Sequence, residues 1–277
     1  MRPSEVVCEA SAVDEASPHI HPFECWRRMG GPGVERSGPF GWEGTCEATD
    51  HAETCHEALA DIAPFVRVQS ELAGASSGGP TVYDPYYCDG ASGRRLRKLG
   101  FGRVVHEPED FYARVASGTV PAHDVVVTNP PYSGDHLMRC VRWCVASGRP
   151  WFLLMPNYVA TRKDYAREVA GAFYVVPRRQ YTFEVPALVN GGAGIHGFSR
   201  ISPFPTLWYC GGLPADHVAA LAGWFRGRKG LRDRVDMALD AADIPAHARH
   251  VPPDRPKRDN PGRRRRLKKR RRTEDDA

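Results

Sequence analysis

The sequence contains no hydrophobic run long enough to cross a membrane. Its apolar stretches fall well short of the roughly 18–20 residues that a spanning helix requires. Residues 1–16 carry acidic side chains and lack an apolar centre, so we do not expect them to act as a secretory signal. The sequence therefore predicts a protein without a membrane partner.

A disulfide framework and a zinc signature are also missing. The eight cysteines are scattered, and a chain of 277 residues can bury a core without cross-links, so a reducing compartment is the simpler interpretation. The His and Cys residues between positions 19 and 56 do not have the spacing of paired cysteines that is common in zinc sites. They are His19, His21, Cys25, Cys46, His51, Cys55 and His56. We favour scattered polar residues in a loop over a metal site and expect no bound metal.

The sequence does contain a hydrophobic strand that ends in a rigid corner. The three valines at 125–127 are typical of a strand buried on both faces of a parallel sheet. They lead through Thr128 into Asn129-Pro130-Pro131-Tyr132, where two prolines fix two φ angles and hold Asn129 out of the helical region. The corner presents an amide and an aromatic ring at the carboxyl end of the strand, where open α/β sheets bind ligands. A stiff surface turn is the alternative, but it would not explain the buried strand.

These four residues resemble the (Asn/Asp/Ser)-Pro-Pro-(Tyr/Phe/Trp) signature of S-adenosylmethionine-dependent amino-methyltransferases. The region from this motif through the loop at 186–203 is also loosely similar to the mRNA cap adenosine N6-methyltransferases. The family methylates exocyclic amines of adenine or cytosine, or the amide of glutamine. The resemblance implies a catalytic corner in which Asn129 and the Pro130 carbonyl accept the N–H groups of the target amine. Pro131 would stiffen this corner, and Tyr132 would stack on the base.

A second motif lies about 45 residues earlier. The stretch Asp84-Pro85-Tyr86-Tyr87-Cys88-Asp89-Gly90 follows a short strand and resembles the Asp-Pro-Phe-x-Gly-x-Gly cofactor motif of the same family. The resemblance implies that Asp84 faces the ammonium group of S-adenosylmethionine, that Tyr86 replaces the Phe, and that Gly90 is the final glycine. Cys88 departs from the pattern, because it occupies the position of the first glycine and would narrow the approach to the cofactor.

Three further residues are candidates for cofactor binding. Thr54 begins an S/T-x-x-E pattern before a predicted helix at 55–72, and in some family members the corresponding segment meets the carboxylate of the cofactor. A plain helix cap is an equal alternative. Glu107 and Asp110 follow a strand at 103–105. The resemblance implies that acids after this strand bind the ribose and the adenine amine of the cofactor. Solvated loop acids are the alternative, because the roughly 20 residues before Val125 are too few for the usual helix, strand and helix.

The order of predicted elements indicates an α/β protein. Strands and helices alternate through 81–210, which predicts a mostly parallel, doubly wound sheet with a closing strand. The resemblance implies that this is a Rossmann-like class I methyltransferase fold, in which the closing strand is antiparallel. We expect an irregular strap at 1–50, a methyltransferase domain at 51–215, surface helices at 216–245 and a disordered basic tail at 246–277.

Basic and aromatic residues after the strand at 173–177 are candidates for substrate binding. Arg178, Arg179 and Arg200 could contact phosphates, and Tyr181 and Phe183 could provide a stacking surface. Solvated charges without a role are the alternative.

The basic charge is concentrated at one end of the chain. Residues 255–277 contain 12 Lys and Arg against four acids, a balance of +8, whereas the net charge is +5, so the remaining residues carry −3. Such a tail could be a nuclear or nucleolar address, a non-specific grip on RNA or DNA, or a segment without a partner.

The sequence therefore predicts an enzyme that uses S-adenosylmethionine to methylate an exocyclic amine. The favoured target is N6 of adenine in nucleic acid, with RNA preferred over DNA. Two alternatives stay open: a protein glutamine N5-methyltransferase, which would use the same corner on an amide, and a degenerate methyltransferase-like domain that only binds nucleic acid or a partner. Cys88 and the shortened strand–helix unit favour the second alternative.

Overall fold

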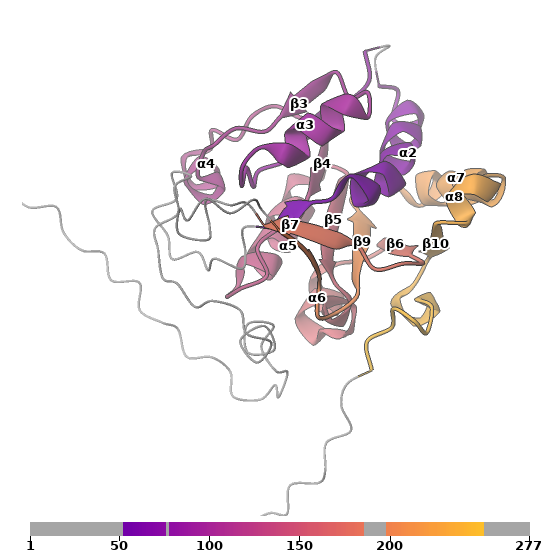
Figure 1. Ribbon diagram of the computed structural model, residues 1–277. Coiled ribbons are helices and arrows are strands. Elements are labelled where there is room, and N and C mark those ends of the chain that lie inside the picture. Colours follow the sequence, from indigo (N-terminus) through magenta and orange to yellow (C-terminus); the bar gives the residue numbers. More distant parts are fainter. Residues whose placement is uncertain (1–51, 76–77, 186–197, 252–277) are drawn as a thin grey trace, which may run out of the picture.

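A seven-stranded sheet forms the centre of the protein, with helices on both of its faces (Figure 1). The computed structural model describes residues 52–75, 78–185 and 198–251, with the backbone alone at 185 and 198–200. The strands lie in the order β10-β6-β9-β5-β4-β2-β3. Their bounds are β2 (Thr81–Tyr83), β3 (Arg103–Val105), β4 (Val125–Thr128), β5 (Trp151–Pro156), β6 (Phe173–Pro177), β9 (Thr206–Gly211) and β10 (Val235–Ala238).

The sheet is mostly parallel, with antiparallel strands at one side. β3, β2, β4 and β5 are parallel neighbours, and β9 pairs antiparallel with both β5 and β6. Five strands, β2 to β6, therefore have their carboxyl ends at the same edge of the sheet. This α/β architecture is compatible with a Rossmann-like fold and agrees with the predicted mostly parallel sheet.

The buried side chains of each central strand alternate between two hydrophobic layers. In β4, Val125 and Val127 pack on one face with α2 (His56–Leu72), α3 (Ala91–Lys98) and α7 (Ala215–Arg226). Val126 packs on the other face with α4 (Phe111–Ser117), α5 (His136–Ser147) and α6 (Lys163–Glu168). All three valines are at most 1% exposed, because both faces of the strand are covered.

The connection between β3 and β4 is short, as the sequence predicted. Among the described residues it holds only α4 and no further strand. β3 is therefore an edge strand of the sheet.

Helices form in the segment 216–245 as predicted, but this segment also contains a strand that was not predicted. After α7 and the short α8 (Lys229–Arg232), the chain forms β10, which pairs antiparallel with β6, followed by the single turn η4 (Ala241–Asp243). Val235 and Ala238 are buried, and this burial against the sheet favours a strand here. The fold also continues beyond 245, because Asn157 Nδ2 donates a hydrogen bond of 2.9 Å to the carbonyl of buried Ala248. The predicted strap at 1–50 and the tail from 252 onward lie outside the described residues.

A small second sheet was not predicted. β1 (Glu53–Thr54) pairs with β7 (Thr182–Val185), and β7 pairs with β8 (Phe198–Ile201), both antiparallel. This sheet brings the residues just before α2 next to the start of α3. In the described part of the chain, no helix has the length and apolar character needed to cross a membrane.

Candidate functional site

The two motifs found in the sequence lie side by side in the structure. β2 lies between β3 and β4 in the sheet. The next two strands along the chain, β3 and β4, are therefore added on opposite sides of β2. Asp84 follows β2 and Asn129 follows β4 at the same edge. Thr128 joins them, since its Oγ1 donates a hydrogen bond of 2.5 Å to Asp84 Oδ1. The carboxyl ends of two such strands form the usual ligand site of an open α/β sheet.

The side-chain amide of Asn129 is hydrogen-bonded through its nitrogen, while its oxygen has no partner among the described residues. Its Nδ2 donates to the carbonyl oxygen of Ala52 at 3.3 Å. Its Oδ1 is buried and has no hydrogen-bond partner among the described residues. A buried amide oxygen without a partner is unfavourable by about 1–3 kcal/mol. Tyr132 at the end of the corner is anchored through its hydroxyl, which donates to the carbonyl oxygen of Leu154 at 3.2 Å.

Asp84 lies deep beneath this corner. Its carboxylate is 4% exposed and accepts hydrogen bonds from Thr128 Oγ1 and from the Tyr86 amide. Burial raises the pKa of Asp84, while His106 and these hydrogen bonds oppose the rise. His106, which the sequence analysis missed, places Nδ1 3.0 Å from the Asp84 carbonyl oxygen and 3.4 Å from Oδ2. Its position directly after β3 was the available signal, but a single buried histidine has no distinctive pattern.

The loop between β2 and α3 follows the path expected of a glycine-rich turn. Cys88 has φ 51°, in the left-handed region that normally favours glycine, and Gly90 has φ 82°. A side chain at Gly90 would be strained by this φ, and its Cβ atom would lie 2.8 Å from the Tyr87 hydroxyl. Tyr86 is buried, with its hydroxyl 3.1 Å from that of Tyr112. Cys88 therefore preserves the backbone conformation of the glycine that the motif lacks.

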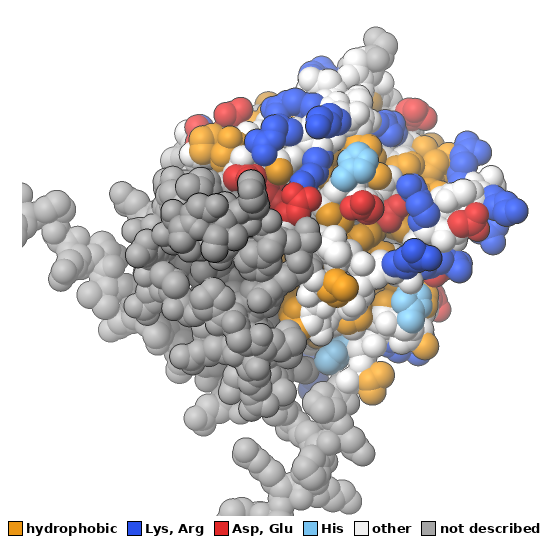
Figure 2. All heavy atoms as spheres, in the orientation of Figure 1, with side chains coloured by type: hydrophobic (Ala, Val, Ile, Leu, Met, Phe, Trp, Pro, Cys, Tyr) orange, Lys and Arg blue, Asp and Glu red, His pale blue; other side chains and the backbone are white. Residues whose placement is uncertain are grey.

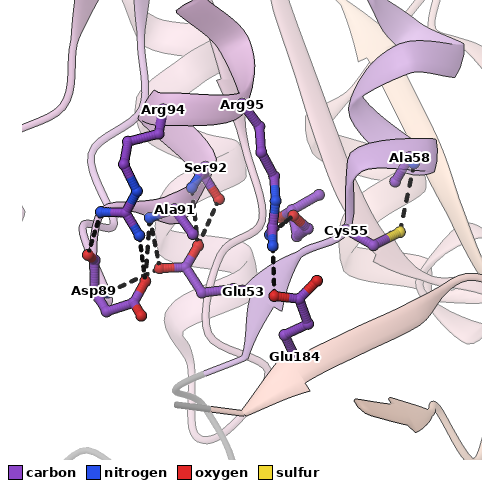
Figure 3. Close-up of polar contacts among 10 residues, drawn as sticks. Glu53, Cys55, Ala58, Asp89, Ala91, Ser92, Arg94, Arg95 and Glu184 are labelled. Atoms are coloured by element: carbon purple, nitrogen blue, oxygen red, sulfur yellow. Dashed lines mark hydrogen bonds and ion pairs between the residues drawn. The ribbon is translucent and has the colours of Figure 1, made fainter. Parts of the chain in front are cut away.

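A buried glutamate at the start of α3 is the second residue that the sequence analysis missed. Glu53 Oε1 accepts hydrogen bonds from the amides of Asp89 and Ala91, and Oε2 accepts from the amide and hydroxyl of Ser92, all at 2.8–3.1 Å (Figure 3). The side chain is 2% exposed, and burial raises its pKa to about 7. A hydrogen bond with Glu53 lowers the pKa of Asp89, the opposite direction to the shift of Glu53.

Thr54 does not cap α2, contrary to the capping-box prediction. The N-cap is Cys55, whose Sγ accepts from the Ala58 amide at 3.5 Å. Thr54 is buried in β1, and its carbonyl oxygen accepts from Arg95, which also pairs with Glu184 at 2.5 Å (Figure 3). Pairing of β1 with β7 shifts the start of the helix by one residue.

The two acids after β3 differ in environment. Glu107 is exposed. Asp110 is the N-cap of α4, and its Oδ1 accepts from the amides of Tyr112 and Ala113 at 2.8 and 3.1 Å. Asp is one of the residues preferred at N-caps, so a structural role explains the presence of Asp110 at this position.

The predicted stacking surface of Tyr181 and Phe183 is wrong. Both rings are buried, at 4% and 6% exposure, and Tyr181 donates its hydroxyl to Asp61 at 3.0 Å. They fill the space between α2 and the small sheet, which sequence spacing could not reveal. Arg178 and Arg179 are exposed at the end of β6, and the side chain of Arg200 lies outside the described residues.

The described residues contain no group of three or more His, Cys, Asp or Glu side chains that could hold a metal ion. Comparison of the chain with models of protein families, with curated proteins and with solved structures gives no match.

Proposed function

We propose that this protein is an S-adenosylmethionine-dependent methyltransferase that acts on an exocyclic amine. The observation that carries the proposal is the Asn129 amide, whose buried Oδ1 has no partner among the described residues while Nδ2 is fixed to Ala52. A buried acceptor of this kind suits a substrate N–H group, which would remove the penalty of the unpaired oxygen.

The sheet supports a class I methyltransferase fold. The strand order places the Asp84 motif and the Asn129 motif on adjacent parallel strands, and β9 supplies the predicted antiparallel closing strand. The single helix between β3 and β4 fits a version of this fold that lacks the strand beyond β3. The proposal requires this arrangement, because the methyl donor and the amine must meet at one sheet edge.

The residues present fit S-adenosylmethionine, with one departure from the expected set. Within the described residues, His106 is the ion-pair partner of Asp84 Oδ2, at 3.4 Å, so the carboxylate retains capacity to accept from an ammonium group. Cys88 and Gly90 both have the left-handed backbone conformation of a glycine-rich turn, and neither residue is β-branched. The amides at the start of α3 are already satisfied by Glu53, so the cofactor carboxylate would need a different partner. When bound, this cofactor supplies an electrophilic methyl group on a sulfonium sulfur.

The chain's own part in catalysis would be to bind and orient the amine. The Asn129 oxygen and the Pro130 carbonyl would accept its two N–H groups and turn its lone pair toward the methyl carbon. Tyr132, which Leu154 anchors through the hydroxyl, would stack on the base. Such placement of reacting groups contributes up to about 7–11 kcal/mol to lowering a barrier. No strong base is needed, because the amine proton becomes acidic as nitrogen takes the methyl group.

The substrate that we propose is adenine N6 in nucleic acid, with RNA favoured. The basic run near the end of the chain suits a polyanion and a nuclear location. A base must leave a duplex to reach a corner of this kind, at a cost of a few kcal/mol, so single-stranded or terminal adenines are the favoured targets.

The test combines cofactor binding with methyl transfer. Calorimetry should detect S-adenosylmethionine binding to the wild-type chain and a loss of affinity in Asp84→Ala. Transfer from labelled cofactor should then be measured into separate RNA, DNA and protein fractions.

The matched variants at the corner are Asn129→Ala and Asn129→Asp. Asn129→Ala should lower transfer at least 100-fold without loss of cofactor affinity, whereas Asn129→Asp, which keeps an acceptor oxygen, should retain part of the activity. Full activity in Asn129→Ala would show that the proposed role is wrong. Label in protein alone would identify a glutamine methyltransferase, and absence of cofactor binding would identify a degenerate domain.

A further inference from the structure

Four rings form a row that begins at the proposed catalytic corner. The ring of Tyr132 lies 5.9 Å from that of Phe204, Phe204 lies 5.6 Å from Tyr158, and Tyr158 lies 6.2 Å from His250. The four residues come from segments far apart in the sequence, and each is partly exposed. Most other aromatic residues of the described core are buried, so this row differs from the core in its access to solvent.

The sheet topology shows where the row lies. Tyr132 follows β4, Tyr158 follows β5 in the single turn η2 (Asn157–Thr161), and Phe204 precedes β9. Because β9 is antiparallel to β5, all three segments lie at the carboxyl edge of the parallel strands. These three rings therefore lie together at this edge, beside the corner.

A basic cluster continues the same edge. Arg178 and Arg179 follow β6, and Arg234 precedes the antiparallel β10, with the Arg178 amide donating to the Arg234 carbonyl at 2.9 Å. Further exposed cations of the cluster are Arg226, Arg228, Lys229 and Arg232. Figure 2 shows Lys and Arg side chains gathered over α7 and α8.

The cluster keeps an excess of positive charge. Arg178 pairs with Asp236 at 2.6 Å and Arg234 with Asp61 at 3.2 Å. Arg179 and Lys229 have no ion pair with any described residue. These cations are therefore available to a polyanion.

The last described segment of the chain connects the region of the aromatic rings with that of the basic cluster. His247 Nε2 lies 3.1 Å from the carbonyl of Pro177 at the end of β6, and Asn157 beyond β5 bonds the carbonyl of Ala248. From β4 to β10 the edge spans four strand spacings, roughly 19 Å. This length corresponds to a few nucleotides.

We infer that this edge, the carboxyl-edge track, binds single-stranded nucleic acid on one side of the target base. Partly exposed rings stack on unpaired bases without regard to sequence, and Arg and Lys hold phosphates. The rings near the corner would receive bases next to the target, and the cations beyond β6 would hold the backbone. The inference rests on the proposed function and names the surface through which the substrate is held.

The first test maps the track by photocrosslinking. The full chain is irradiated with a single-stranded 12-nucleotide RNA probe that carries 4-thiouridine at successive positions, and adducts are located by peptide mass spectrometry. We expect adducts in the peptides that contain Tyr158 and Phe204. Adducts that all lie elsewhere, for example only in residues 252–277 or on α3, would overturn the inference.

The second test separates stacking from charge. The double variant Tyr158→Leu/Phe204→Leu, which keeps apolar volume, should weaken binding of the probe about tenfold or more without changing its salt dependence. The double variant Arg179→Gln/Lys229→Gln should lower the slope of log affinity against log salt concentration by about 1.4, since each phosphate contact on a single strand contributes about 0.7.

Arg97→Gln/Lys98→Gln provides the matched control. It removes the same charge at the end of α3, near the amino end of β3, and should change affinity by less than twofold. An equal loss of affinity in the control and the Arg179/Lys229 variant would show a general charge effect and refute the track.

The outcomes also separate the track from the proposed function. Asn129→Ala should lose methyl transfer while its crosslinks stay in place. If the crosslinks map to the track but Asn129→Ala keeps its activity, the proposed function fails and the binding surface stands. If they map elsewhere while Asn129→Ala is inactive, the reverse holds.

Discussion

The ionisation of Glu53 should make the stability of this protein fall as pH rises from about 4.5 to about 7. Its carboxyl group is enclosed at the start of α3 by Asp89, Ala91 and Ser92, with 2% exposure (Figure 3). Burial is the largest cause of its raised pKa, which lies at about 7 instead of 4.5. The folded state thus holds a proton that the unfolded chain releases near pH 4.5.

The size and sign of the effect follow from linkage. A carboxyl group with a raised folded pKa contributes stability that is complete below pH 4.5 and is lost as pH rises to about 7. The difference between the two pKa values corresponds to about 3 kcal/mol. Because Asp89 has a lowered pKa, its own contribution is lost only as the solution becomes more acidic, below this window.

Urea unfolding of the wild type and of Glu53→Gln at pH 5, 6, 7 and 8 tests this reasoning. Fluorescence of the buried Trp151 and Trp208 reports the transition. The wild-type free energy of unfolding should fall by about 3 kcal/mol relative to that of Glu53→Gln between pH 5 and 8. Glu184→Gln removes a neighbouring but exposed carboxylate and should follow the wild type.

A constant difference between the wild type and Glu53→Gln across this pH range would refute the assignment. It would mean that Glu53 keeps the same charge in the folded protein from pH 5 to pH 8. A pH dependence that disappears in Glu184→Gln instead would point to the Arg95 ion pair as its source.

Two further substitutions test the turn and the link between the motifs. Cys88→Gly should leave the free energy of unfolding unchanged or raise it by up to about 1 kcal/mol, because φ 51° favours glycine, whereas Cys88→Val should lower it by at least about 1 kcal/mol in thermal or urea unfolding. The opposite order would contradict the left-handed turn. Thr128→Val removes the hydrogen bond to Asp84 and should lower stability by about 1–3 kcal/mol, as well as affinity for S-adenosylmethionine. Thr128→Ser keeps the hydroxyl and should retain both; equal losses in the two variants would show that packing, and not this bond, matters.

The sequence by itself determined the elements whose signals are local. Three valines followed by two prolines predict β4 and its corner, and the residues of β3 and β6 match the predicted ranges. Apolar runs predict β4, β5 and β6 well because these strands are buried along their whole length. The resemblance implied that the two motifs serve one site, and the strand order brings them to the same edge.

Tertiary structure alone decided which polar and aromatic residues face the site. The sequence predicted a stacking surface at Tyr181 and Phe183, but both are buried where β1 pairs with β7. The same pairing brings Glu53 to the amides of α3, 36 to 39 residues further along the chain. The row from Tyr132 to His250 likewise depends on strand order. Burial and proximity of this kind arise between segments that are far apart in the sequence, so they cannot be predicted from the spacing of residues along the chain.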